Sequence, residues 1–126
     1  MSNFFSIIPI PDPLKAQSLV YDLKKRLDWG EPALTIIDIR DREAFNISHI
    51  SGAVSLPMNE LVNRALINLE PSRDLYVYGS TDEQVAEAAA QLRTAGYQNV
   101  SELRGGLAAW KANSYPIEGN SAVVNK

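Results

Sequence analysis

The chain of 126 residues has no cysteine, and His49 is its single histidine. Without cysteine the chain can form no disulfide bond, no catalytic thiolate, and no zinc or iron–sulfur site with thiolate ligands. A single imidazole per chain also excludes a metal site built from several histidines. We therefore expect neither a metal nor another cofactor in this protein.

Positive charge is also scarce, with 12 lysines and arginines against 15 aspartates and glutamates, a formal net charge of −3 and a pI near 5.1. Nucleic acid is excluded as the main partner, because binding to its phosphates requires a basic face. No run of lysines points to an anionic membrane surface. The apolar stretch 4–10 follows no basic residue, is broken by proline, and is shorter than the ~20 residues that span a bilayer. We expect a cytoplasmic protein without a membrane partner.

Hydrophobic residues make up 45% of the chain and charged residues 21%, which is typical of an ordered globular protein. A chain of this length is long enough for one hydrophobic core but not for two. We predict a single domain over residues 1–119, a flexible tail over residues 120–126, and a monomer.

Continuous apolar runs alternate with helical patterns along the chain. The runs Leu34–Asp38 and Leu75–Tyr78 are typical of parallel strands that are buried on both faces. Pro13, after the potential cap Asp12, predicts a helix that ends near Gly30. This order of elements predicts an α/β fold with about five parallel strands and helices on both faces. The predicted strands cover residues 4–8, 34–38, 53–55, 75–78 and 99–101, and the predicted helices cover residues 13–30, 41–46, 57–67, 82–95 and 107–112.

A loop with the features of an anion-binding site follows the strand that ends at Tyr78. It consists of Gly79, Ser80, Thr81, Asp82, Glu83 and Gln84. An alanine-rich helix comes next, so backbone N–H groups and the helix dipole converge at the loop and favour an anion. Catalysis on such an anion usually requires an attacking thiolate and a cation. The loop has two carboxylates and no lysine or arginine, so it has the position of an active site without its chemistry.

Two separated stretches of the chain form a pair of signatures. The first comprises Ile36–Arg40 and Ser48–Ala53, and the second runs from Tyr76–Tyr78 to Ala109–Trp110. Together they resemble the rhodanese-like (sulfurtransferase) family, and two signatures in the correct order are more specific than one short motif. The resemblance implies a three-layer α/β sandwich of the rhodanese type, with residues 79–84 as its active-site loop.

The departures from the family pattern lie in this loop. The resemblance places the nucleophilic cysteine at Gly79, the loop glycine at Asp82, and the closing arginine and serine at Gln84 and Val85. The related cell-cycle phosphatases need cysteine and arginine at the positions of Gly79 and Val85, so their chemistry is excluded too. The resemblance thus implies a catalytically inactive member that acts as a protein-binding or regulatory module. We expect Gly79→Cys alone to stay inactive, because Asp82 and Glu83 repel an anionic donor.

Three functions remain open. The first is a binding module, which binds an unidentified protein or peptide at the former active-site loop, residues 79–84, and at a set of polar residues. These residues are Asp38, Arg40, His49, Asp82 and Glu83. The second is a residual role in thiosulfate or persulfide sulfur transfer, with the thiol supplied by a partner. The third is a purely structural domain.

The polar residues of the loop also have a structural interpretation. Both Thr81-x-x-Gln84 and Ser80-x-x-Glu83 fit a capping box, in which carboxylates favour the first helical turn. Asp82 and Glu83 therefore either recruit a cationic partner or stabilise the helix terminus. A hydroxyl of Ser80 or Thr81 acting as the nucleophile would need an adjacent base, and the loop offers only carboxylates.

The site residues outside the loop have two readings as well. Asp38 and Arg40 lie at the carboxyl end of a strand, where α/β folds bind ligands, or they form an ion pair that fixes the following loop. His49 is either a general base with Asp38 or a hydrogen-bonded residue of the turn before strand 53–55.

Overall fold

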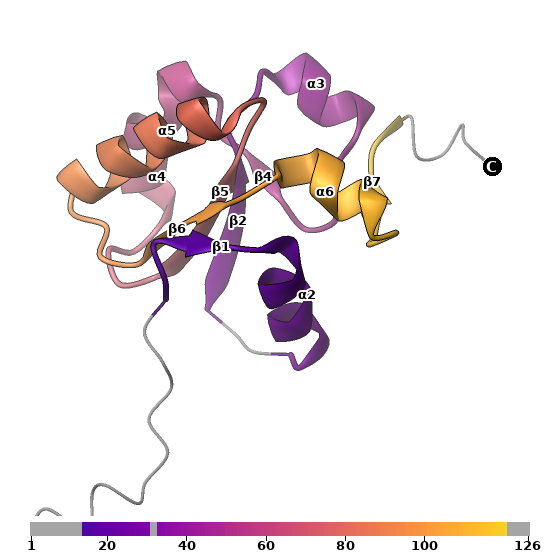
Figure 1. Cartoon of the computed structure of the whole chain (residues 1–126). Coiled ribbons are helices and arrows are strands. Elements are labelled where there is room, and N and C mark those ends of the chain that lie inside the picture. Colours follow the sequence, from indigo (N-terminus) through magenta and orange to yellow (C-terminus); the bar gives the residue numbers. More distant parts are fainter. Residues whose placement is uncertain (1–13, 31–32, 121–126) are drawn as a thin grey trace, which may run out of the picture.

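The computed structural model describes residues 14–30 and 33–120 as a sheet between two layers of helices (Figure 1). The helices are α2 (Val20–Asp28), α3 (Arg42–Ile47), the 3₁₀ helix η1 (Met58–Glu60), α4 (Leu61–Asn68), α5 (Asp82–Thr94) and α6 (Gly106–Ala112). The strands are β1 (Gln17–Ser18), β2 (Leu34–Asp38), β3 (His49–Ile50), β4 (Val54–Ser55), β5 (Asp74–Tyr78), β6 (Val100–Leu103) and β7 (Ile117–Glu118).

The main sheet has five strands in the order β1-β6-β5-β2-β4, and all four strand pairs are parallel. The predicted α/β fold with about five parallel strands is confirmed. The long strands β2 and β5 pair at the centre, with Leu34 opposite Asp74 and Asp38 opposite Tyr78. Because the strands are parallel, the segments that follow Asp38 and Tyr78 leave the same end of the sheet, where α/β folds place their sites.

Alternate side chains of β5 belong to different layers, as expected for a strand with a period of two residues. Leu75 and Val77 pack in one cluster with residues of α4 and α5. Tyr76 and Tyr78 pack in a second cluster with residues of α2 and α6, including Trp110. In Figure 1, α4 and α5 accordingly cover one face of the sheet, and α2 and α6 cover the other.

The start of the first predicted helix is wrong. Gln17 and Ser18 form the edge strand β1, which pairs with β6, and the helix begins only at Val20. The buried hydroxyl oxygens of Ser18 and Ser101 lie 2.5 Å apart across the two strands. The pairing with β6, far along the chain, thus overrides the local helical pattern. Tyr21, in the first turn of this helix, is 60% exposed.

A second sheet was not predicted. β3 and β7 pair antiparallel, with His49 opposite Glu118 and Ile50 opposite Ile117. His49 therefore lies in a strand rather than in the turn that the sequence suggested. Two-residue strands have too little pattern to be recognised from sequence.

Two predictions fall largely on residues outside the described ranges, namely the strand at residues 4–8 and the tail at residues 120–126. Within residues 14–30 and 33–120, no helix is long and apolar enough to cross a membrane.

Candidate functional site

The second half of the former active-site loop, residues 82–84, forms the first turn of α5, and the helix starts where the sequence predicted it. α5 begins at Asp82, so only three residues separate it from β5. The Thr81 Oγ1 accepts a hydrogen bond from the backbone N–H of Gln84 at 3.1 Å. Thr81 is therefore the N-cap of α5. Of the two predicted capping boxes, only the Thr81–Gln84 box has its first hydrogen bond, the one accepted by the Thr81 hydroxyl.

Gly79 has no room for a side chain. A Cβ atom built on it would lie 2.7 Å from Cγ1 and 3.0 Å from Cδ1 of Ile39, and 3.4 Å from a methyl group of Val85. Ile39, the residue that follows β2, is only 5% exposed. On another side, a Cβ at Gly106 would lie 3.3 Å from the Gly79 carbonyl oxygen, and the φ of +50° at Gly106 also favours glycine. The buried side chain of Ile39 thus fills the position where a nucleophilic side chain would begin.

Asp82 is not a free anion at the loop. Its Oδ2 lies 3.3 Å from a guanidinium nitrogen of Arg104, and its Oδ1 accepts a hydrogen bond from the Gly105 N–H at 3.4 Å. Arg104 follows β6, which is the neighbour of β5, so the sheet brings a cation to a loop that has none of its own. Sequence reasoning missed this pair because no local pattern connects positions 22 residues apart. Asp82 therefore already has a cationic partner within the chain.

Asp38 and Arg40 form the ion pair that the sequence predicted as one of two possibilities. Arg40 Nη2 lies 2.7 Å and Nε 3.2 Å from Oδ2 of Asp38, whose side chain is fully buried. Arg40 also donates to the Ser48 carbonyl oxygen at 2.7 Å, which ties the end of β2 to the segment before β3. The hydrogen bonds that the Arg40 guanidinium donates to the Asp38 carboxylate raise the pKa of Arg40. The hydrogen bonds of this guanidinium are therefore made within the fold, to Asp38 and to the Ser48 carbonyl oxygen, rather than to a ligand anion.

His49 makes contacts typical of a structural residue. Its ring stacks on Phe45 with centroids 3.7 Å apart, and its Nδ1 lies 2.7 Å from the Phe45 carbonyl oxygen. Its Nε2 faces Glu118 of β7 at 3.5 Å. Hydrogen bonds from the backbone N–H of Gly52 and the side chain of Ser51 lower the pKa of Glu118. In the described ranges His49 makes no hydrogen bond to Asp38, so the general-base pair is not formed.

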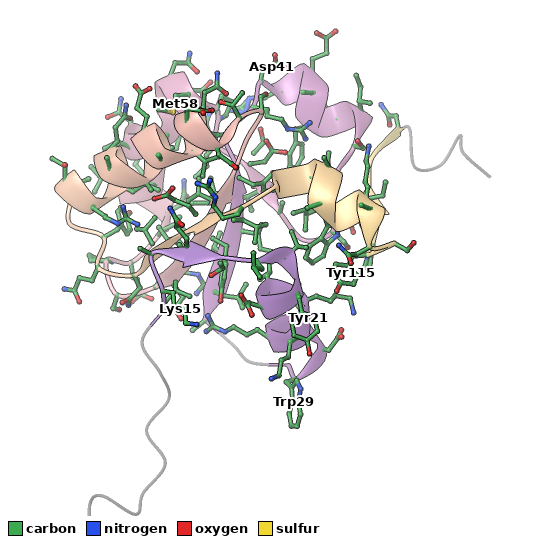
Figure 2. All side chains as sticks on the ribbon, in the orientation of Figure 1. Lys15, Tyr21, Trp29, Asp41, Met58 and Tyr115 are labelled. Atoms are coloured by element: carbon green, nitrogen blue, oxygen red, sulfur yellow. The ribbon has the colours of Figure 1, made fainter. Side chains whose placement is uncertain are left out.

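A hollow of about 280 Å³ lies beside the loop, and we call it the loop hollow. It is lined by Ile39, Arg40, Asp41, Met58, Ser80, Gln84 and Glu87. Figure 2 shows Asp41 and Met58 at the same end of the molecule, which is the end where β2 and β5 terminate. The loop hollow thus brings together Arg40 and Gln84, two residues that the sequence placed at the candidate site. Its other lining residues Asp41, Met58 and Glu87 were not predicted from the sequence. Glu87 lies one turn after Glu83 on α5, and this spacing was the available signal.

No group of three or more histidine, aspartate or glutamate side chains in the described part of the chain is arranged to hold a metal ion.

Comparisons with known proteins identify the fold family. The sequence profile of the rhodanese-like domain matches residues 19–113. The rhodanese-like domain of the Alr3790 protein from Anabaena sp., solved by NMR in solution, is 54% identical and aligns with a TM-score of 0.83, covering 86% of this chain and 83% of that one. A sulfurtransferase from Allochromatium vinosum is 33% identical over 95 residues, which is 75% of this chain and 87% of that protein.

Other relatives are much longer than this chain. The probable adenylyltransferase/sulfurtransferase MoeZ from Mycobacterium tuberculosis is 35% identical over 97 residues, which cover 75% of this chain and 24% of MoeZ. The chain spans less than half of the length of the first curated relatives that it matches. Because the family profile matches most of the chain, and because a relative of similar length agrees, the chain belongs to the rhodanese-like domain family, and it does so without a cysteine.

Proposed function

We propose that this protein is a non-catalytic rhodanese-like domain that binds a protein or peptide partner at the loop hollow. The observation that carries the proposal is the packing of Ile39 against Gly79, 2.7 Å from the position of a Cβ atom. A thiolate must be placed at an attack distance from its substrate. Here Ile39 already occupies the space that the Cβ atom of such a side chain would need. The chain therefore lacks both the nucleophile and the space for it.

The electrostatics of the loop also oppose the binding of a small anionic sulfur donor. The N-terminus of α5 would attract an anion, but its first turn carries Asp82 and Glu83. Arg40 is occupied by the buried Asp38, and Arg104 is occupied by Asp82. No cation near the loop is left without a carboxylate partner in the described residues, so a bound anion gains little.

The hollow itself supports a binding role. Ser80 and Gln84 are exposed at its edge, and Ile39 and Met58 contribute apolar surface. A concave surface that combines apolar contact with a few polar groups is the usual form of a recognition site. An alternative role in sulfur transfer, with the thiol supplied by a partner, has no residue in the hollow that favours it.

Two measurements test the proposal. The first is sulfur transfer from thiosulfate to cyanide, for which we expect no rate above a blank without protein. Turnover by this cysteine-free chain would overturn the non-catalytic assignment.

The second measurement is affinity capture from the source lysate with the native chain, with Gln84→Arg at the hollow, and with Gln98→Arg as the control. Gln98 is exposed and precedes β6, so it lies at the other end of the parallel strands. We expect a partner that the native chain and Gln98→Arg retain and that Gln84→Arg loses. A set of partners that is identical for all three proteins would overturn binding at the hollow.

A further inference from the structure

An apolar groove of about 460 Å³ runs between α4 and α5, and we call it the α4–α5 groove. It is lined by Val62, Glu87, Ala90, Gln91, Thr94 and Ala95. Small side chains at Ala90 and Ala95 leave this open, shallow depression on the surface of the two helices. Leu66, one turn after Val62 on the same side of α4, is 56% exposed and extends the apolar surface.

The α4–α5 groove and the loop hollow adjoin, because Glu87 lines both of them. Glu87 lies in the second turn of α5, between the loop and the apolar part of the helix. A bound chain segment can therefore occupy the hollow with one side chain and the groove with others.

The charge at the hollow end of this surface is negative. Arg40 is paired with the buried Asp38 at 2.7 Å. Arg42 and Arg64 both contact Glu60, and these hydrogen bonds lower the pKa of Glu60. In contrast, neither of the two carboxylates that line the hollow, on Asp41 and Glu87, forms an ion pair in the described part of the chain. Asp41 Oδ1 accepts a hydrogen bond from the Ala44 N–H at 2.8 Å as the N-cap of α3, whereas the carboxylate of the exposed Glu87 has no cationic partner in the described residues. The hollow therefore carries negative charge, chiefly on Glu87, beside the partly exposed Met58.

Resting on the proposed function, we propose that the partner is a peptide segment that places a lysine or arginine in the loop hollow and apolar side chains in the α4–α5 groove. The aliphatic stem of a long cationic side chain packs on the partly exposed Met58 while its charged head reaches Glu87, with Asp41, another lining residue of the hollow, adding negative charge. Apolar anchors in a groove supply most of the affinity in such complexes, and charge complementarity supplies specificity.

The test uses a random twelve-residue peptide library displayed on phage, selected on the native chain of 126 residues. We expect selected peptides to be enriched in a basic residue followed by apolar residues. A synthetic copy of the most enriched peptide then gives affinities by fluorescence polarisation. Glu87→Gln should weaken binding about threefold and Glu87→Lys more than about tenfold, and Ala90→Gln, which fills the groove, should weaken it as well.

Matched substitutions outside the loop hollow and the α4–α5 groove serve as controls. Glu70→Gln, in the turn after α4, removes the same charge, and Ala112→Gln, on α6, adds the same side chain. Neither should change the affinity. Selection of acidic peptides, or of peptides that bind Glu87→Lys and Ala90→Gln as tightly as the native chain, would overturn this inference.

Gln84→Arg separates this inference from the proposed function. Peptides that lose affinity for Gln84→Arg but not for the Glu87 and Ala90 variants would leave binding at the hollow standing and overturn only the basic–apolar segment. Peptides insensitive to all three sites, or no enrichment at all, would overturn both.

Discussion

The packing of Ile39 against Gly79 decides how much has to change before this site can hold a nucleophile. The methylene carbon of Ile39 lies 2.7 Å from the place of a Cβ atom, so cysteine at residue 79 requires Ile39 to move as well. Asp82 is paired with Arg104, which weakens the repulsion of an anionic donor that the sequence suggested. The expectation that Gly79→Cys stays inactive therefore rests more on packing than on charge.

A double-mutant cycle tests this contact without any chemistry. We expect Gly79→Ala to lower the free energy of unfolding by about 1–3 kcal/mol, the usual cost of overpacking, although alanine normally stabilises a position with negative φ. In the Ile39→Ala background the same change should cost at least about 1 kcal/mol less, because the clash is gone. Urea denaturation of the four proteins gives both values. Strictly additive effects would show that the two residues do not compete for space.

Tyr78 should make the free energy of unfolding decrease as the pH rises through the alkaline range. Burial raises the pKa of its phenol, and the nearby charge of Asp38 raises it further. A folded-state pKa above the unfolded value of about 10 gives stability that is complete below about pH 10 and is lost as the pH rises. The free energy of unfolding should therefore fall by up to about 1.4 kcal/mol per pH unit above pH 10 relative to Tyr78→Phe. Urea denaturation at about pH 9, 10 and 11 tests the difference, and parallel curves would contradict it.

At the scale of elements, the start of α5 depends on one of two candidate caps. The Thr81 hydroxyl accepts a hydrogen bond from Gln84, whereas the exposed Ser80 hydroxyl forms no hydrogen bond within the described residues. Thr81→Ala should lower the free energy of unfolding by about 1 kcal/mol. Thr81→Ser should retain most of the stability, and Ser80→Ala should change it by less than about 0.5 kcal/mol. Equal losses for Thr81→Ala and Ser80→Ala would show that the cap is shared.

The same elements explain which features can be predicted from the sequence. The β5 strand and the cap at Thr81 depend on neighbouring residues, so hydrophobic runs and spacing are sufficient. β1 consists of two residues, and its ladder to β6 is invisible to a local pattern, which is why a helix was predicted there. The ion pair of Asp82 with Arg104 and the packing of Ile39 on Gly79 likewise arise only when neighbouring strands meet.

At the scale of the whole molecule, the C-terminal strand β7 closes the fold against β3. The carbonyl oxygen of Pro116 accepts hydrogen bonds from Trp110 Nε1 at 2.7 Å and from the Ser51 N–H at 3.1 Å. Trp110 is 1% exposed, and its ring forms a T-shaped contact with the ring of Tyr115 at a centroid distance of 5.0 Å. This short segment therefore covers the largest side chain of the core and satisfies its polar atom.

Truncations test this closure together with the predicted tail. Ending the chain after Ser114 should lower the free energy of unfolding by at least about 3 kcal/mol, because Trp110 loses its cover and its hydrogen-bond acceptor. Ending it after Asn120 should change the value by less than about 0.5 kcal/mol if the tail contributes no packing. Because a loss of this size is a large share of the stability of a small domain, Ile117→Ala provides a milder test, with an expected loss of about 1–2 kcal/mol. Full stability of Ile117→Ala in urea, with unchanged tryptophan emission, would show that β7 is dispensable and that the core is closed without it.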